Sequence, residues 1–265
     1  MQFPDIDPVA FSLGPVFGLG PLIVHWYGLT YLFGFSGAWV FGKIRAKKSY
    51  SPIEPDAVDD LIFYAAMGAI LGGRIGYILF YNFSAFIDDP MLIFRIWQGG
   101  MSLHGGVLGV MVAYWLMARK YHCKTFQLID FLAPLSCFGL FFGRIGNFIN
   151  SELWGRTTDV PWGVVFPHAG PLPRHPSQLY EAFLEGIVLF IILWIYTAKE
   201  RPYLAPTGLV LMLYGCFRFF IEFYRMPDAH IGYMAFGWLT RGQVLSVPMI
   251  LIGLTLFVIA HKRSA

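Results

Sequence analysis

The sequence has unusually few charged residues. Asp, Glu, Lys and Arg make up 13% of its 265 residues, while 57% are hydrophobic. A soluble domain carries about a quarter charged residues, so much of this surface faces something other than water. The formal net charge is only +3, and no basic run is dense enough to indicate nucleic-acid binding.

Residues typical of metal sites and of familiar catalytic motifs are also scarce. Cys123, Cys137 and Cys216 have no CxxC spacing, so we interpret them as small hydrophobic residues in packed helices. The seven histidines show no HxxxH or HxxE spacing. Neither a Gly-x-Ser-x-Gly elbow nor a phosphate-binding P-loop occurs. We expect no metal and no organic cofactor, and if the chain is an enzyme, a nucleophile supplied by the substrate.

Long apolar runs predict an all-α polytopic membrane protein with a single membrane domain, residues 1–265. About seven spans are expected, at residues 22–42, 59–80, 102–118, 126–143, 178–198, 206–224 and 243–261. A long outer connection, 144–177, contains five prolines. A loop of that length is usually functional.

The basic residues predict how the chain is oriented. All seven lysines and four arginines follow the first, third, fifth and seventh spans. The positive-inside rule places these ends in the cytoplasm, so the N-terminus is expected outside, in the periplasm, and the C-terminus inside. The eight remaining basic residues fall on outer loops or outer halves of spans, and all are arginines: Arg74, Arg95, Arg144, Arg156, Arg174, Arg218, Arg225 and Arg241.

Arginine offers a planar, permanently charged fork that binds phosphate or carboxylate through two hydrogen bonds. For Arg95, Arg156 and Arg174, extension towards lipid headgroups is an equally open interpretation. Arg74 and Arg218 lie inside expected spans, where an ionisable group is costly, so a functional role is favoured for them.

The strongest polar cluster is residues 143–156, GRIGNFINSELWGR, where the fourth span reaches the outer surface. Its glycines permit close approach of backbones, and Arg144, Asn147 and Glu152 supply convergent polar groups. Capping of a glycine-rich helix end is the alternative, but four polar side chains in so short a stretch disfavour it.

A second segment, residues 99–106, opens the third span and contains His104. A lone histidine at a membrane interface is more often structural, but glycines on both sides leave room for another molecule. A neutral imidazole, titrating near ~6.5, could then take a proton.

Two further segments carry polar groups into spans. Tyr214, Arg218, Glu222 and Arg225 follow i, i+4, i+8, i+11 spacing and predict one polar stripe on the sixth span. The stripe either fixes helix packing through an internal ion pair or positions an anionic headgroup. In residues 174–181, Ser177 is expected to cap the fifth span, with Tyr180 and Glu181 facing inward.

Taken together, the motifs resemble those of the prolipoprotein diacylglyceryl transferase family along almost the whole chain. The matching segments are 25–28, 72–76, 101–106, 143–156, 172–181 and 214–225. The resemblance implies a multi-pass enzyme of the bacterial inner membrane whose active site faces the periplasm. It would move the diacylglyceryl group of phosphatidylglycerol to the lipobox cysteine thiol of a prolipoprotein, forming a thioether and releasing glycerol 1-phosphate.

The resemblance also implies the site residues. Arg144 matches the phosphatidylglycerol-binding arginine, and the other matching positions are Tyr27, His104, Asn147, Glu152, Gly155, Tyr214, Arg218, Glu222 and Arg225. We expect Arg144 and Arg218 to stabilise the leaving phosphate, and His104 to generate the nucleophilic thiolate. Glu152, Glu222 and Asn147 would orient the arginines or the glycerol hydroxyls.

Two other classes of protein remain as alternatives. An anion or lipid transporter would also place arginines inside a helical bundle, but alternating access requires polar residues in both halves of the membrane. Here the inner halves of the spans are nearly free of charge. A scaffold protein that only binds lipid would tolerate replacement of Arg144 or His104.

Overall fold

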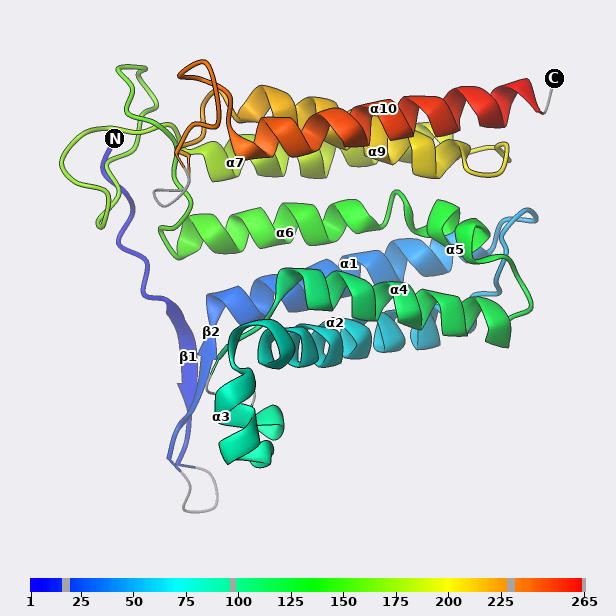
Figure 1. Cartoon of the computed structure of the whole chain (residues 1–265), viewed down its shortest axis with the longest axis horizontal. Coiled ribbons are helices and arrows are strands. Elements are labelled where there is room, and N and C mark those ends of the chain that lie inside the picture. Colours follow the sequence, from blue (N-terminus) through cyan, green and yellow to red (C-terminus); the bar gives the residue numbers. More distant parts are fainter. Residues whose placement is uncertain (16–19, 96–98, 228–231, 264–265) are drawn as a thin grey trace. The chain divides into compact units, whose positions relative to one another are not determined.

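The computed structural model describes residues 1–15, 20–95, 99–227 and 232–263. The chain forms two compact units, one of Met1–Ala38 with Leu132–Ala265 and one of Trp39–Phe131. Both units are mainly helical (Figure 1).

The first unit begins with an antiparallel hairpin of β1, Val9–Leu13, and β2, Leu22–His25, before helix α1, Trp26–Ala46 (Figure 1). The residues of α1 from Trp39 on belong to the second unit. The expectation of a purely helical chain is therefore wrong at residues 22–25, which were placed at the start of the first span. The branched side chains of Ile23 and Val24 favour an extended backbone, and β1 supplies hydrogen-bond partners that an apolar run does not reveal.

Four helical segments complete the first unit. They are α6, Ser136–Ile149; the continuous run α7, Ser177–Glu181, π-helical η3, Ala182–Val188, and α8, Leu189–Tyr196; α9, Ala205–Ile221; and α10, Arg241–Lys262. The core contains the buried side chains of Cys137, Leu189, Leu193 and Leu209. Cys137 is thus the packed residue that the sequence predicts, whereas Cys216 is exposed and Cys123 is only partly buried, in the link after α4.

Three local boundaries differ from the sequence-based expectation. Helix α6 continues past residue 143 to Ile149, which places the polar residues of GRIGNFI on a helix instead of a loop. Helix α9 ends at Ile221, so Arg225 lies beyond the helix and is not part of one helical stripe. The residue before α7 is Pro176, and the Ser177 hydroxyl donates to the Leu153 carbonyl at 3.1 Å instead of capping the helix.

The second unit contains α2, Ala57–Tyr81; α3, Phe83–Asp88; η1, Pro90–Phe94; and α4, Leu103–Lys120. Helix α5, Thr125–Leu132, ends where the two units meet in the sequence. Helices α2 and α4 lie side by side (Figure 1). Glycines permit this close packing, since a Cβ added to Gly109 would lie 2.0 Å from the Gly68 carbonyl oxygen.

Several helices have the length and hydropathy of membrane spans. Among the described residues, Ala57–Tyr81, Ser177–Tyr196 and Arg241–Lys262 qualify alone, while α5 and α6 qualify only together as one broken span. Large apolar side chains on α10, such as Leu251 and Ile252, are more than half exposed. These outward apolar faces fit a helical membrane protein, whereas the count of seven spans and the orientation stay predictions.

Candidate active site

Three arginines of the first unit converge on the carboxylate of Glu181. Arg144 Nε contacts Glu181 Oε2 directly, and Arg218 Nη1 lies 3.2 Å from the same oxygen. Arg225 Nη1 lies 3.6 Å from Glu181 Oε1. The Glu181 side chain is 1% exposed, so these contacts form away from water. We call Arg144, Arg218 and Arg225 with Glu181 the arginine cluster.

The cluster draws its residues from separate elements. Arg144 lies on α6, Glu181 ends α7, Arg218 lies in the last turn of α9, and Arg225 follows that helix. No single segment could bring three guanidinium groups to one carboxylate, so the site depends on the tertiary packing of the first unit.

Gly155 allows two backbone segments to cross beside the cluster. Its N–H donates to the His175 carbonyl at 2.9 Å, and it pairs with Arg225 in an isolated bridge. A Cβ at this position would lie 2.6 Å from both the His175 and the Tyr224 carbonyl oxygens. Gly155 therefore shapes the site through backbone packing, because no other residue fits there.

A second carboxylate, Glu222, fixes the orientation of Arg218. Arg218 Nη2 donates to Glu222 Oε1 at 2.6 Å, and the Thr240 hydroxyl donates to Glu222 Oε2 at 2.6 Å. Thr240 is the N-cap of α10, where it forms a capping box with Gln243. Arg218 is thus held by two carboxylates, and Glu222 links the ends of α9 and α10.

A line of polar contacts runs from Arg144 to an open cavity. Arg144 Nη1 donates to Asn147 Oδ1 at 3.4 Å, and Asn147 Nδ2 donates to Glu152 Oε1 at 2.8 Å. Glu152 and Tyr27 line a cavity of about 720 Å³ together with Asn150. A ligand in this cavity would meet hydroxyl, amide and carboxylate groups that connect directly to the arginine cluster.

Tyr214 and His104 occupy different surroundings. Tyr214 lies on α9, one turn before Arg218, and packs against the buried apolar core of the first unit. His104 lies in the first turn of α4, in the second unit, and its side chain is exposed. Every other site residue expected from the sequence lies in the first unit, so the role of His104 stays a prediction.

Two arginines outside the cluster bind backbone carbonyls. Arg156 Nε donates to the Arg225 carbonyl at 2.9 Å, and Arg156 Nη2 donates to the Glu222 carbonyl at 3.2 Å. It therefore supports the backbone beneath the cluster.

Arg74 is buried, and its guanidinium donates to the carbonyls of Leu92, Ile93, Arg95, Gly99 and Gly100. These hydrogen bonds hold residues 92–95 and 99–100 in place, and the functional role favoured for Arg74 stays a prediction.

Sequence reasoning predicted that Glu181 faces inward, but did not place Glu181 or Glu185 among the site residues. Both side chains are at most 1% exposed. The sequence did offer a signal: Glu181 and Glu185 lie four residues apart in an otherwise apolar run, and buried charges in a span require partners. Identifying those partners requires the packing of α7 and η3 against α6 and α9.

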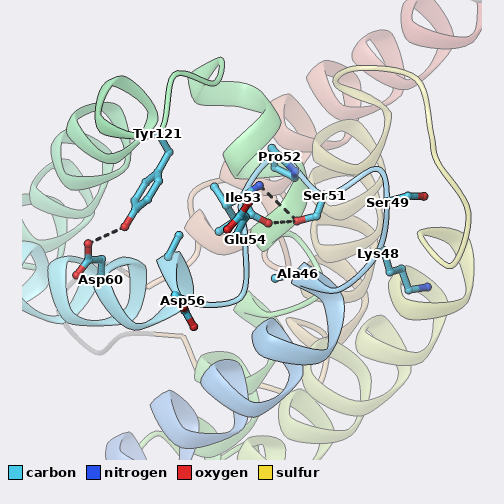
Figure 2. A pocket seen from close by; sticks show the side chains of 11 residues that line it. Ala46, Lys48, Ser49, Ser51, Pro52, Ile53, Glu54, Asp56, Asp60 and Tyr121 are labelled. Atoms are coloured by element: carbon cyan, nitrogen blue, oxygen red, sulfur yellow. Dashed lines mark hydrogen bonds between the residues drawn. The ribbon is translucent and has the colours of Figure 1, made fainter.

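The second unit has a cavity of its own, of about 790 Å³ (Figure 2). The charged residues of its lining are mostly acidic: Glu54, Asp56 and Asp60 outnumber Lys48. The Tyr121 hydroxyl donates to Asp60 Oδ2 at 2.7 Å. This acidic lining does not suit an anionic ligand.

In the described parts of both units, no group of three or more His, Cys, Asp or Glu side chains could hold a metal ion.

The apolar outer helix faces are those of a membrane protein, and its first unit buries the arginine cluster. A family model described as prolipoprotein diacylglyceryl transferase matches residues 15–259. The chain belongs to the prolipoprotein diacylglyceryl transferase family.

Curated relatives named phosphatidylglycerol–prolipoprotein diacylglyceryl transferase match along nearly their whole length. A Pseudomonas paraeruginosa relative is 54% identical over 265 residues, covering 100% of this chain and 97% of its own. An Oleidesulfovibrio alaskensis relative is 57% identical over 263 residues, covering 99% and 96%. A Coxiella burnetii relative is 56% identical over 253 residues, covering 96% and 95%.

Proposed function

We propose that this chain transfers the diacylglyceryl group of phosphatidylglycerol to the lipobox cysteine thiol of a prolipoprotein. The products are a thioether-linked lipoprotein precursor and glycerol 1-phosphate. Membership of the family supports the reaction, and the convergence of Arg144, Arg218 and Arg225 on one buried carboxylate supports the position of the site. A transporter is not favoured, because the relatives are named for group transfer.

Arg144 and Arg218 would hold the phosphate of the lipid. The reaction breaks the bond between the diacylglyceryl carbon and a phosphate oxygen, and that oxygen keeps the electron pair. Negative charge therefore grows on the leaving glycerol phosphate. Fixed cations in a site that excludes water stabilise such charge more effectively than mobile ones. Arg225 and Tyr214 would complete the phosphate site, with Glu222 orienting Arg218 through their 2.6 Å contact.

The glycerol headgroup would occupy the cavity beside Arg144. Tyr27 and Glu152 line this cavity, and Asn147 joins Glu152 to Arg144. Carboxylate and amide groups suit the free hydroxyls of glycerol, since each hydroxyl both donates and accepts a hydrogen bond. Apolar helix faces would hold the two acyl chains.

His104 would act as the general base. A thiol attacks carbon efficiently only as a thiolate, and a neutral imidazole can take its proton. The exposed position of His104 on the first turn of α4 leaves its ring accessible to an incoming peptide.

The enzyme would be a single membrane domain of seven spans in the bacterial inner membrane. Lysines gather after alternate spans, which supports a periplasmic N-terminus and a cytoplasmic C-terminus. Arg144 and Arg218 would then lie towards the periplasmic side, where a prolipoprotein presents its signal peptide after export.

A transfer assay with purified protein tests this function. Phosphatidylglycerol is supplied with a lipobox peptide that carries either Cys or Ser at the acceptor position. We expect a diacylglyceryl mass shift on the Cys peptide alone, with one glycerol phosphate released per peptide modified. A protein that binds phosphatidylglycerol but modifies neither peptide would overturn the proposal and lead to a flux assay in liposomes.

A further inference from the structure

Glu185 is completely buried beside the arginine cluster, yet its carboxyl group has poor contacts. Its side chain is 0% exposed, and neither oxygen accepts a hydrogen bond from the described residues. Its nearest guanidinium contact is 4.0 Å, between Glu185 Oε2 and Arg144 Nε. That same nitrogen pairs much more closely with Glu181.

The two neighbouring carboxylates are partnered far better. Glu181 likewise accepts no hydrogen bond from the described residues, but it contacts three guanidinium groups, with distances of 3.2 Å to Arg218 and 3.6 Å to Arg225. Glu222 lies 2.6 Å from Arg218 and accepts a hydrogen bond from Thr240. Each of these two carboxylates therefore has a direct cationic partner. Glu185 has no comparable partner among the described residues.

The local backbone holds Glu185 in this position. It lies in η3, and single π-helical turns occur frequently at functional sites. The next residue, Gly186, packs tightly against α6, because a Cβ there would lie 2.6 Å from the Phe141 Cβ. Close packing of η3 on α6 therefore fixes the carboxyl group near Arg144.

The groups that face Glu185 come from each polar element around it. Arg144 lies on α6, Glu181 ends α7, Tyr214 and Arg218 lie on α9, and Arg225 follows α9. Helix α8, which continues η3, contains no Asp, Glu, Lys, Arg or His. The three arginines attract an ionised carboxylate here, but it would be buried without hydrogen-bond donors and repelled by Glu181. Burial is the largest of these effects and disfavours the charged form.

We propose that Glu185 holds a proton and is neutral, so that the arginine cluster together with Glu222 carries one net positive charge matched to a phosphodiester. This inference rests on the proposed function for the identity of the anion. Three arginines with the ionised Glu181 and Glu222 leave one positive charge, whereas an ionised Glu185 would leave none. At the edge of the cluster, Glu152 and Arg156 have opposite charges and cancel.

A neutral Glu185 gives the site a preference among lipid headgroups. The phosphodiester of phosphatidylglycerol has a single negative charge, which the cluster would balance. Phosphatidylcholine has the same phosphodiester charge but adds a quaternary ammonium, which a site of net positive charge would repel. Glu185 is therefore a positioning and specificity residue, because it acts through the charge of the arginines.

Infrared spectroscopy of the purified full chain tests the proton directly. The wild-type spectrum minus that of Glu185→Gln is expected to contain the carbonyl stretching band of a protonated carboxylic acid. A difference spectrum with carboxylate bands instead would overturn the proposal. If Glu185→Gln does not fold, the apolar Glu185→Met has similar volume and serves as the reference in the same measurement.

Lipid binding tests whether the site has the net charge that a neutral Glu185 implies. Native mass spectrometry would measure phosphatidylglycerol bound to wild type and Glu185→Gln, with phosphatidylcholine as the zwitterionic control. We expect the Gln variant to keep the preference for phosphatidylglycerol within about threefold. If Glu185 were ionised, its neutralisation would add a positive charge and tighten anion binding by about tenfold or more, which would contradict us. Failure of the wild-type transfer assay would instead reject the proposed function and leave the infrared result unaffected.

Discussion

At the scale of single residues, Arg218 is the side chain whose geometry depends most on the guanidinium fork. Nη1 lies 3.2 Å from Glu181 and Nη2 lies 2.6 Å from Glu222, so two nitrogens serve two different carboxylates. A lysine could supply the positive charge, but its single ammonium could not contact both carboxylates and a phosphate at once, as the planar guanidinium group can.

We therefore expect Arg218→Lys to lower the transfer rate about 100- to 1000-fold, the usual cost of removing one donor to developing charge. The transfer rate is measured from the amount of lipidated peptide formed over time, by mass spectrometry. Arg95→Lys is the matched control, because Arg95 forms a partly exposed ion pair with Asp89 in the second unit and should stay near wild-type activity. Full activity of Arg218→Lys would show that only charge balance matters at this position.

Arg144→Ala should abolish turnover, since it removes the guanidinium that contacts Glu181 and reaches Asn147. The initial rate with phosphatidylglycerol and the Cys peptide measures this effect, alongside a thermal unfolding curve to verify folding. A folded Arg144→Ala protein with near-normal turnover would remove Arg144 from the site.

His104→Gln should lower the transfer rate much more than it weakens phosphatidylglycerol binding, because a general base acts mainly in the transition state. Rates and lipid binding are measured on the same preparation. His168→Gln is the control, since His168 is exposed in the connection before α7. Equal losses of rate and binding would mean that His104 is not the base.

Sequence alone could predict part of this site. The Arg218–Glu222 ion pair follows from i, i+4 spacing on a helix. The central role of Glu181 could not be predicted, because its three partners lie on α6, α9 and the segment after α9. Spacing along a chain determines contacts within a helix, but contacts between helices depend on packing.

At the scale of elements, the glycines between α2 and α4 control how closely these helices pack. A Cβ on Gly109 would lie 2.0 Å from the Gly68 carbonyl oxygen, whereas one on Gly106 would lie 3.4 Å from the nearest atom. The two glycines lie on the same helix, so they provide a matched pair of substitutions.

Gly109→Ala is expected to destabilise the protein by about 1–3 kcal/mol, since the added methyl group must push the two helices apart. Gly106→Ala should be tolerated, because its methyl group finds nearly ordinary contact distances. Thermal unfolding in one detergent compares both variants with wild type. Equal unfolding temperatures for the two variants would show that the α2–α4 contact is looser than described.

Long apolar runs in the sequence coincide with helices such as α2 and α10, but the local details of the fold did not follow from hydropathy. The hairpin strand at Leu22–His25 was missed because apolar, β-branched residues suit a strand and the end of a span equally. The π-helical turn at Ala182–Val188 leaves no signature in hydropathy. The strand depends on its pairing with β1, and η3 packs closely on α6 at Gly186.

At the scale of the whole molecule, charge is distributed very unevenly along the chain. Lysines occur only after alternate apolar segments, while the arginine cluster lies among helices whose outward faces are apolar. The positive-inside rule would produce the distribution of the lysines, and a buried anion site would produce the cluster of arginines. The orientation of the chain therefore decides on which side of the membrane the reaction takes place.

Cysteine labelling in intact cells tests that orientation. In a chain whose three native cysteines are replaced by alanine, Asp159→Cys would report the long connection and Glu54→Cys the segment before α2; both native side chains are exposed. We expect a membrane-impermeant thiol reagent to label Asp159→Cys in intact cells and Glu54→Cys only after permeabilisation. The cysteine-free parent must retain transfer activity as the control. The reverse pattern would invert the topology and place the arginine cluster towards the cytoplasm, where an exported prolipoprotein could not reach it.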